Sequence, residues 1–204
     1  MLHCDISPNN LMCEVLVQAD GSESLRVILI DLDLAIMLNE DGLPIEEESG
    51  PRFGTPPFVA IELLDNRDCP HYLRHDFESA FYVALWFTVQ SKIGFLERED
   101  SNTSHMKKSL WFLWTDGPLR RCLVKGDFML AKNFAPYQDW LVAVWRVLFN
   151  GRMDRWSRWA DDDEGRELES ELAETLGGCV TYSKFKAAMD DVRPKLKSMI
   201  PNLI

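Results

Sequence analysis

The chain has 204 residues, of which 46% are hydrophobic and 27% charged, enough apolar material for one buried core in a single domain. Its formal net charge of −11 repels a phosphate backbone and excludes the usual basic type of nucleic-acid-binding protein. The five cysteines form no C-x-x-C pair and have no histidine at metal-ligand spacing, so neither a zinc site nor a disulfide framework is indicated. Without a secretory leader or an apolar run of roughly 20 residues, we expect an intracellular protein, cytoplasmic or nuclear.

The first motif lies at the N-terminus, where His3, Asp5 and Asn10 fit the pattern H-x-D-x-x-x-x-N. This is the spacing of the protein kinase catalytic loop, in which the aspartate accepts the proton of the substrate hydroxyl and the asparagine holds magnesium. Aspartate and asparagine also favour turns and helix N-caps, so this match taken alone is only moderately specific.

Two β-runs follow, residues 11–18 and 25–32, separated by Asp20-Gly21, a dipeptide that readily adopts positive φ and closes hairpins. The second run ends in Asp31-Leu32-Asp33. A carboxylate at the end of an apolar strand is a suitable oxygen ligand for Mg²⁺, although the run by itself could be any buried strand ending in a turn.

Residues 33–57 show no periodicity and contain the run Glu46-Glu47-Glu48, which we interpret as a solvated loop rather than a substrate-steering patch. A loop of that length in a compact domain is usually functional or disordered. It leads into GTPPFVAIE, residues 54–62. This stretch has the spacing of the protein kinase segment that ends in A-P-E, with Ala60 and Glu62 in register and Ile61 in place of the proline.

The rest of the sequence predicts helices. A buried helix that Asp76 opens is apolar on almost every face from Phe77 onward, and a second helix covers residues 140–148. A third, near residues 167–176, is ended by Gly177-Gly178, and a fourth, near 182–192, starts from Thr181 as N-cap and stops at Pro194. The tryptophans are expected to serve as packing residues, among them Trp111, Trp114, Trp140, Trp145, Trp156 and Trp159.

Four stretches, HCDISPNN, LIDLDLA, GTPPFVAIELL and HDFESAFYVALWF, together resemble the signature sequences of the fungal-type protein kinases, a divergent branch of the protein kinase superfamily. The resemblance is strong over residues 2–90 and looser beyond. It implies a mainly α fold with a small β-hairpin, the C-terminal lobe of an α+β kinase fold, over residues 1–204. Its parts would be a catalytic loop (3–10), a metal-binding turn (31–33), an activation and substrate segment (33–62) and a helical subdomain (76–204).

The same resemblance implies a role for each candidate residue. Asp5 would be the catalytic base and Thr55 the substrate-loop threonine that contacts it, while Asn10 and Asp31 would bind the Mg²⁺ of Mg²⁺-ATP. His3 and Leu32 would belong to an apolar spine behind the site. Glu62 and Asp76 would be structural, with Asp76 accepting hydrogen bonds from backbone N–H groups of the catalytic loop. A protein would supply the acceptor hydroxyl.

The sequence departs from the kinase pattern at several positions. Cys4 stands where many kinases have an arginine that pairs with a phosphorylated activation loop, Ser7 replaces a common lysine, and Asp33 replaces the glycine of D-F-G. In the family, the elements that grip ATP precede the catalytic histidine, and this chain contains no G-x-G-x-x-G. We therefore expect the N-terminal lobe to be absent, the isolated chain to be inactive, and a partner to cover the surface that this lobe would shield.

Three functions remain in competition. The first is a fragment of a Ser/Thr-type protein kinase. The second is a small-molecule phosphotransferase of the aminoglycoside or choline kinase type, whose catalytic loop and strand end look similar but which lacks a peptide-binding segment such as GTPPFVAIE. The third is a catalytically silent pseudokinase or binding module, which Asp33 and the missing ATP-gripping elements favour.

Overall fold

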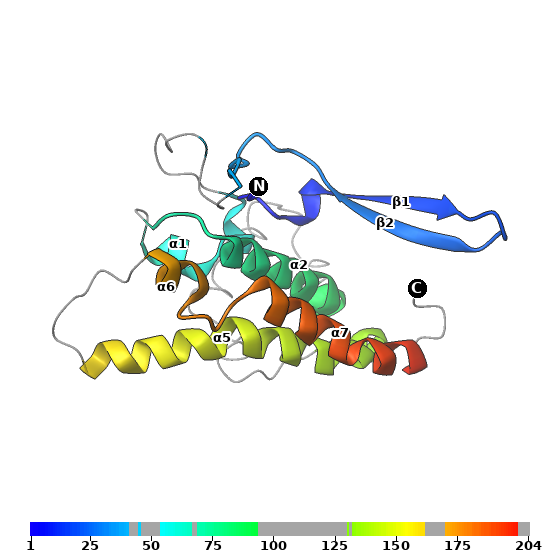
Figure 1. Ribbon diagram of the computed structural model, residues 1–204. Helices are drawn as coiled ribbons and strands as arrows, with labels where there is room; N and C mark the ends of the chain where they lie inside the picture. The colour runs from blue at the N-terminus through cyan, green and yellow to red at the C-terminus, as the bar shows by residue number, and fades with distance from the viewer. Residues whose placement is uncertain are drawn as a thin grey trace. The chain divides into compact units, whose positions relative to one another are not determined.

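The computed structural model describes residues 1–40, 45, 54–66, 69–93, 130, 132–161 and 170–199. The described residues form helices and one small antiparallel sheet, which confirms the expected mixture of many helices with a β-hairpin (Figure 1). The run Glu46-Glu47-Glu48, Trp111 and Trp114 lie outside the described residues. None of the described helices is both long and apolar enough to span a membrane.

The hairpin consists of strands β1 (Leu11–Val17) and β2 (Glu23–Leu29), which pair from Leu11 opposite Leu29 to Val17 opposite Glu23. The turn lies where Asp20-Gly21 predicted it, with Gly21 at φ 80°. Strand β2 ends at Leu29, three residues earlier than expected. The Ile30 N–H still bonds to the Asn10 carbonyl at 3.0 Å, in register with the ladder, and the left-handed φ of 65° at Asp31 then turns the chain out of the strand.

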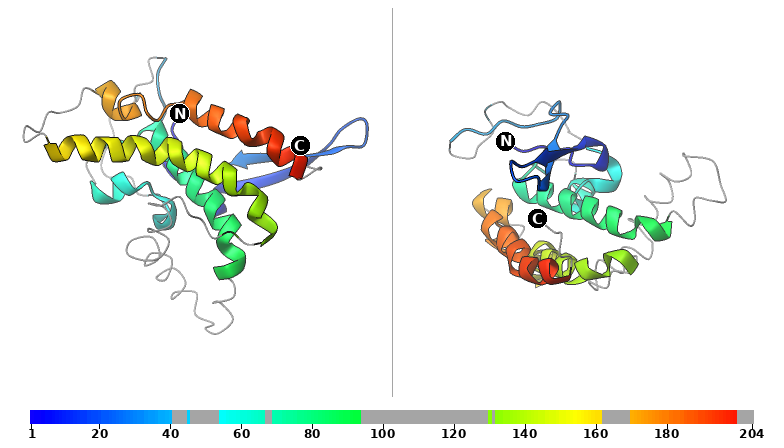
Figure 2. Two further views of the ribbon diagram at one scale, coloured as in Figure 1. Left: turned by 90° about the horizontal axis from the view of Figure 1, so that it is seen from below. Right: turned by 90° about the vertical axis from the view of Figure 1, so that its right-hand side faces the viewer.

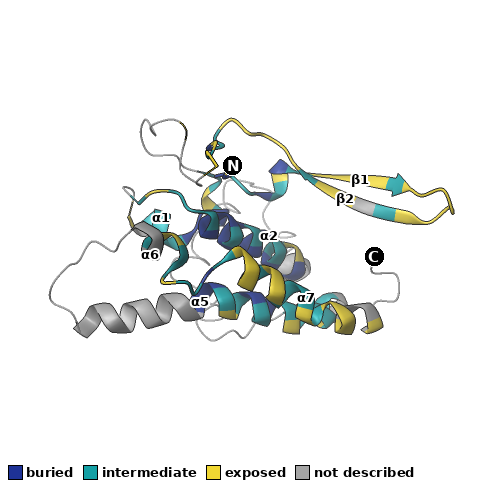
Figure 3. Cartoon of the chain, viewed as in Figure 1, coloured by how far each residue is buried: buried dark blue, intermediate teal, exposed yellow. Residues whose placement is uncertain are grey.

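The two faces of the hairpin differ in chemistry. Directly opposed residues share a face, so one face carries an almost entirely apolar set and the other carries the Glu14–Arg26 ion pair. Much of the apolar face is open to solvent, with Val15 57%, Val17 69% and Val27 60% exposed (Figure 3). Among the residues whose side chains are described, this face consists of Leu11, Cys13, Val15, Val17, Val27 and Leu29, together with Glu23 opposite Val17.

A small cluster anchors the N-terminal segment. Leu2, Cys4 and Ile36 are buried together, and Leu2 and Ile36 form an isolated antiparallel bridge with N–H···O bonds of 2.9 Å in both directions. The partly buried side chains of Leu34, Leu38 and Leu73 pack against this cluster. The cluster therefore fixes the segment that leads directly into the H-x-D motif.

Helix α2 (Leu73–Ile93) follows the short helix α1 (Ile61–Asp65). Phe81, Tyr82 and Leu85 are among its buried side chains, as expected for a central helix. Asp76 lies in the first turn of α2 rather than at its opening position. The described residues divide into two compact units at Val83, within the continuous helix α2.

The second unit contains α5 (Gln138–Asp161), α6 (Ser170–Thr175) and α7 (Tyr182–Met199), with α5 preceded by a 3-10 helix at Lys132–Tyr137. Helices α5 and α7 lie side by side (Figure 2). Leu141, Val144, Leu148 and Phe149 form the buried stripe of α5. The packing role expected of the tryptophans holds for Trp145, whose ring stacks on Phe149 at 6.0 Å between centroids.

The ends of the later helices test two sequence predictions. The Thr181 hydroxyl accepts the Lys184 N–H at 3.3 Å, which confirms Thr181 as the N-cap of α7. The prediction that Pro194 ends this helix is wrong, because α7 continues through it to Met199. A proline inside a helix costs about 3 kcal/mol, but α7 packs along α5, and tertiary packing of this kind stabilises helices more than local propensity does.

Candidate active site

The Asp5 carboxylate is the point where two distant segments meet. Its Oδ1 accepts the backbone N–H of Thr55 at 2.6 Å and the Thr55 hydroxyl at 2.8 Å. Its Oδ2 accepts a hydrogen bond from Asn10 Nδ2 at 2.9 Å, and the same nitrogen donates to the Asp5 carbonyl at 2.9 Å. The contact between Thr55 and Asp5 that the kinase resemblance implies is therefore present across 50 residues of sequence.

Gly54 explains how these segments approach so closely. A Cβ at this position would lie 2.7 Å from the Cys4 carbonyl oxygen and 3.0 Å from Asp5 Oδ1. Real Cβ atoms do not approach a backbone oxygen as closely as 2.7 Å, so any side chain would push the 54–55 segment away from Cys4 and Asp5. The glycine is required here for space rather than for an unusual φ.

We expect Gly54→Ala to destabilise the fold by about 1 to 3 kcal/mol through overpacking, and to separate Thr55 from Asp5. Chemical denaturation would measure the first effect and the amide resonance of Thr55 the second. Gly21→Ala is the matched control. It has nothing within 4 Å and strains only the hairpin turn, so it should leave the Thr55 resonance unchanged. Wild-type stability and an unshifted Thr55 amide in Gly54→Ala would contradict this explanation.

The end of β2 is hydrogen-bonded to the segment of residues 3–10. Besides the bond from the Ile30 N–H to Asn10, the Ile30 carbonyl accepts His3 Nε2 at 3.1 Å. The next residue, Asp31, has φ 65°, as does Cys4. Left-handed backbone is costly for residues other than glycine, and it persists where surrounding bonds enforce it, often at functional sites. Asp31 directly follows Ile30, and Cys4 lies between His3 and Asp5.

The oxygen atoms around this turn suit a magnesium ion. The two bonds from Asn10 Nδ2 use both amide hydrogens, so Oδ1 is the atom of this side chain that can face a cation. Asp31 and Asp33 are exposed at the adjacent turn. A carboxamide oxygen with carboxylates is the hard donor set that Mg²⁺ prefers, so the residues present fit this metal.

Asp76 of helix α2 holds the segment that carries His3 and Asp5. Its Oδ2 accepts the His3 N–H at 2.7 Å, and its Oδ1 accepts the Cys4 N–H at 3.1 Å, as expected from the resemblance. His71 Nε2 also lies 2.9 Å from Oδ1. Burial raises the pKa of Asp76, but the His71 hydrogen bond and charge and the two backbone N–H groups outweigh it and hold the pKa below 3.8.

His3 and Leu32 differ in their surroundings. His3 is buried, and its Nδ1 accepts the Asp5 N–H at 3.3 Å while Nε2 faces the Ile30 carbonyl. Leu32 is 50% exposed, so its expected place in a packed spine needs correction. The reason is that β2 ends early and Leu32 falls in a surface turn, where its carbonyl accepts the Ala35 N–H at 3.0 Å.

The segment that contains Glu62 is held to α2 by two carboxylates. Glu62 Oε2 pairs with the buried Arg74 guanidinium at 2.5 Å. Burial raises the pKa of Glu62, but hydrogen bonds from His75 and Arg74 and the Arg74 charge lower it well below 4.5. In the opposite direction, Glu78 of α2 accepts the Ile61 N–H at 2.9 Å and the Tyr82 hydroxyl at 2.5 Å. The Glu62–Arg74 ion pair and the hydrogen bond from Ile61 to Glu78 therefore both hold α1 to α2.

Residues 1–88 match the family model described as fungal protein kinase. The match includes every candidate residue of the site, from His3 to Asp76. No curated protein and no solved structure matches the chain. The agreement between this match and the Asp5, Thr55 and Asn10 contacts supports a kinase-like function for this part of the chain.

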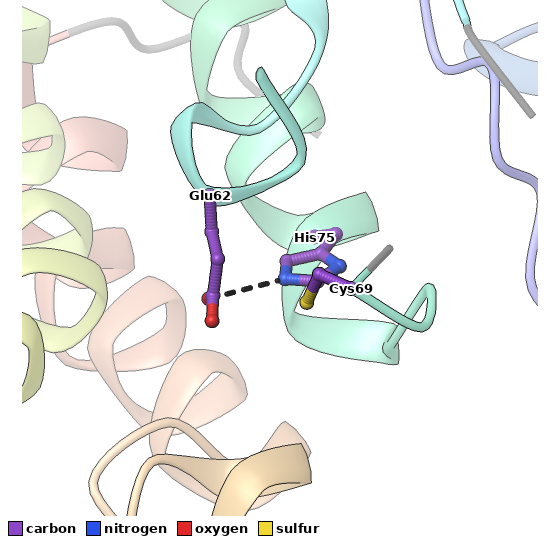
Figure 4. A group of neighbouring side chains, drawn as sticks. All are labelled: Glu62, Cys69 and His75. Carbon is purple, nitrogen blue, oxygen red and sulfur yellow. Dashed lines mark hydrogen bonds and ion pairs between the residues drawn. The ribbon is translucent and has the colours of Figure 1, made fainter. Parts of the chain in front are cut away.

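Glu62, Cys69 and His75 could each offer one metal-ligand atom, and these atoms, a carboxylate oxygen, a sulfur and a ring nitrogen, lie within 4.8 Å of one another (Figure 4). The hydrogen bonds and the ion pair of His75 and Glu62 argue against a metal at this group. His75 Nδ1 accepts the Tyr72 N–H at 3.1 Å, which places the ring proton on Nε2, the atom that faces Glu62 at 3.5 Å. A protonated nitrogen cannot bind a metal, and Glu62 is already paired with Arg74. We interpret the group as a hydrogen-bonded support for α1.

His75 gives stability a pH dependence. Its burial, together with the Arg74 charge, lowers its pKa from 6.5 to about 4, although the Glu62 hydrogen bond opposes this. Between pH 6.5 and about pH 4, the unfolded chain therefore binds a proton at His75 that the folded chain does not bind. The free energy of unfolding consequently falls as the pH falls through this range. From pH 7.5 to 5.5 we expect a loss of about 1.3 kcal/mol from this group.

Chemical denaturation at the two pH values measures this effect, with His75→Gln as the comparison, since glutamine does not titrate. At pH 5.5 the carboxyls of Glu62 and Asp76 remain ionised, because both have ordinary values of 4.5 or below and lowered values in the fold. The wild-type protein should lose about 1.3 kcal/mol more than the variant. Equal losses would contradict the buried, neutral state of His75.

Sequence reasoning missed four residues that hold this site together. His71, Arg74, His75 and Glu78 each bond to a candidate residue or to the segment that carries one. A signal was available, since charged residues crowd the start of a helix that is otherwise apolar on nearly every face. Polar groups buried at such positions need partners, so their presence indicates long-range contacts without naming them.

Proposed function

We propose that this chain is the C-terminal, catalytic-loop lobe of a fungal-type protein kinase, which transfers the γ-phosphoryl group of Mg²⁺-ATP to a hydroxyl group of a protein. The observation that carries the proposal is the set of bonds from Thr55 and Asn10 to the Asp5 carboxylate. These residues come from two motifs whose spacing independently matches the kinase pattern. The family match over residues 1–88 supports the same reading.

Asp5 would act as the base. A carboxylate offers about four lone-pair positions, and among the described residues three are used, two on Oδ1 by Thr55 and one on Oδ2 by Asn10. A lone pair of Oδ2 therefore remains to accept the proton of an incoming hydroxyl group. Because Thr55 and Asn10 fix the carboxylate from two sides, this oxygen is oriented before the substrate arrives, which is what general base catalysis requires.

Asn10 and Asp31 would hold the metal. The Asn10 amide is oriented by its bonds to Asp5, and Asp31 is placed by the bonds of Ile30 to Asn10 and His3. When bound, Mg²⁺-ATP supplies the phosphoryl group and neutralises charge on its phosphates. The protein contributes ligands at fixed positions beside the base.

The segment at residues 54–62 favours a protein acceptor over a small molecule. Thr55 binds Asp5, while the Ile61 N–H and the Glu62 carboxylate are bound to α2. The segment is thus fixed at both ends beside the base, as a platform for an extended peptide needs to be. A small-molecule phosphotransferase has no use for this platform.

A silent binding module is the second candidate, favoured by Asp33 in place of glycine and by the exposed Leu32. Metal binding separates it from the first. Mn²⁺ titrated into ¹⁵N-labelled protein should broaden the amide resonances of Asn10 and Asp31 before others, and Asp31→Ala should abolish this selectivity. Asp20→Ala removes another exposed turn carboxylate of the same hairpin and should change nothing. Equal broadening in Asp31→Ala and wild type would contradict the proposed metal site.

A further inference from the structure

His71 lies in the stretch just before α2 and contacts the carboxylate that supports the catalytic loop. The distance from its Nε2 to Asp76 Oδ1 is 2.9 Å, and both side chains are only 7% exposed. The same carboxylate accepts the N–H groups of His3 and Cys4. Since an ionised carboxylate can only accept, the proton in the His71 contact is on Nε2. One buried carboxylate therefore joins His71 to the backbone of the catalytic loop.

His71 binds the same oxygen of the Asp76 carboxylate that accepts the Cys4 N–H. Oδ1 accepts both the His71 N–H and the Cys4 N–H, whereas Oδ2 accepts the His3 N–H. Cys4 has a left-handed φ of 65°, a conformation that a residue with a side chain keeps only when its surroundings hold it. Cys4 directly precedes Asp5, so the direction of the Asp5 side chain depends on this backbone conformation.

We propose that His71 is a positioning residue of the candidate active site, whose Nε2–H fixes Asp76 Oδ1 so that this oxygen holds Cys4 in its left-handed conformation and directs Asp5 toward Thr55. The catalytic meaning of this inference rests on the function proposed above. The structural content does not, because it concerns bonds among residues of this chain.

Two further observations support the role. His71 lines the same small pocket as Cys4, Asp5 and Thr55, so it lies beside the groups that it would position. After burial, which raises it, the largest influences on the pKa of Asp76 are the hydrogen bond and the charge of His71, and both lower it. Without His71, the buried Asp76 carboxylate would keep two backbone donors among the described residues and would be freer to protonate or rotate.

The test uses side chains of matched length. The glutamine introduced by His71→Gln can place its Nε2 where the histidine Nε2 lies, since the same number of bonds separates each from Cβ. His71→Asn is equally polar but one methylene shorter, and His71→Leu offers no donor. We would measure hydrogen exchange and amide shifts of His3 and Cys4 in the ¹⁵N-labelled full chain, normalised to the Val144 amide in α5. Thr88→Val, which removes a buried hydroxyl group later in α2 that donates to the Leu85 carbonyl, is the control.

We expect the normalised protection of the Cys4 amide to fall at least about tenfold in His71→Leu and His71→Asn, with a smaller fall at His3, and to return to within about threefold of wild type in His71→Gln. Thr88→Val should leave it unchanged. If His71→Leu does not fold, the contrast between His71→Asn and His71→Gln decides. Equal Cys4 protection in these two variants, or an equal loss in Thr88→Val, would overturn the proposal. Failure of the kinase function would appear instead as lost Mn²⁺ selectivity, with the Cys4 result intact.

Discussion

Replacing Asp76 by alanine should lower the free energy of unfolding by about 3 to 5 kcal/mol, because the change removes a buried ionised acceptor and leaves its donors without a partner. Those donors are the N–H groups of His3 and Cys4 and the Nε2–H of His71. A typical domain is stable by only ~5 to 15 kcal/mol, so this single substitution would remove a large part of the total. Thermal and chemical denaturation would measure the loss.

Asp139→Ala is the matched control for Asp76→Ala. Asp139 is an exposed carboxylate on α5 that pairs with Lys195 of α7, and exposed ion pairs contribute about 0 to 1 kcal/mol. Its loss should therefore change the melting curve little. Similar melting curves for the two variants would mean that Asp76 is an ordinary helix-terminal carboxylate and would contradict its role in holding the backbone at His3 and Cys4.

Phosphoryl transfer should depend on Asp5 by a factor of about 10² to 10⁴, the usual contribution of a general base. The 204 residues alone should show no useful transfer, because positioning and electrostatic stabilisation of the nucleotide dominate this chemistry and the sequence contains no glycine-rich phosphate loop. Transfer should appear when a nucleotide-binding lobe is joined to the chain. Asp5→Asn should then abolish most of it.

A radiolabelled-ATP assay with a protein acceptor would test both parts. Asp20→Asn, at the exposed hairpin turn, should retain full activity and controls for the loss of a carboxylate. Robust transfer by residues 1–204 alone, lost in Asp5→Ala, would contradict the expected dependence on a second lobe while upholding the role of Asp5. Full activity of Asp5→Asn in the joined protein would remove Asp5 from the mechanism.

Local patterns in the sequence predicted local structure well. The two β-runs and Asp20-Gly21 located the hairpin and its turn, and Thr181 was correctly identified as the N-cap of α7. These features depend on residues within a few positions of one another, so their physical cause is contained in a short stretch of sequence. The match of residues 1–88 to the fungal protein kinase model agrees with the motifs found in the same region.

Long-range contacts decided where the predictions failed. Strand β2 ends early because Asp31 adopts a left-handed φ of 65°, next to an Ile30 carbonyl that is bound by His3, 27 residues earlier in the chain. That early end places Leu32 at the surface, although its apolar character favours burial. Helix α7 passes through Pro194 because it packs along α5.

The sequence by itself determined which residues have the chemistry of a kinase site, since Asp5, Asn10, Asp31 and Thr55 are identified by type and spacing. Only the tertiary structure decided how they are held. It brought Thr55 close to Asp5, which is possible because Gly54 has no Cβ. It also placed Asp76 where its carboxylate accepts the N–H groups of His3 and Cys4 and that of the His71 ring. The physical reason is that a hydrogen bond to a buried carboxylate is lost when the donor–acceptor distance changes by a few tenths of an ångström. Here the donors and acceptors belong to segments about 50 to 70 residues apart, and no spacing along the chain encodes such distances.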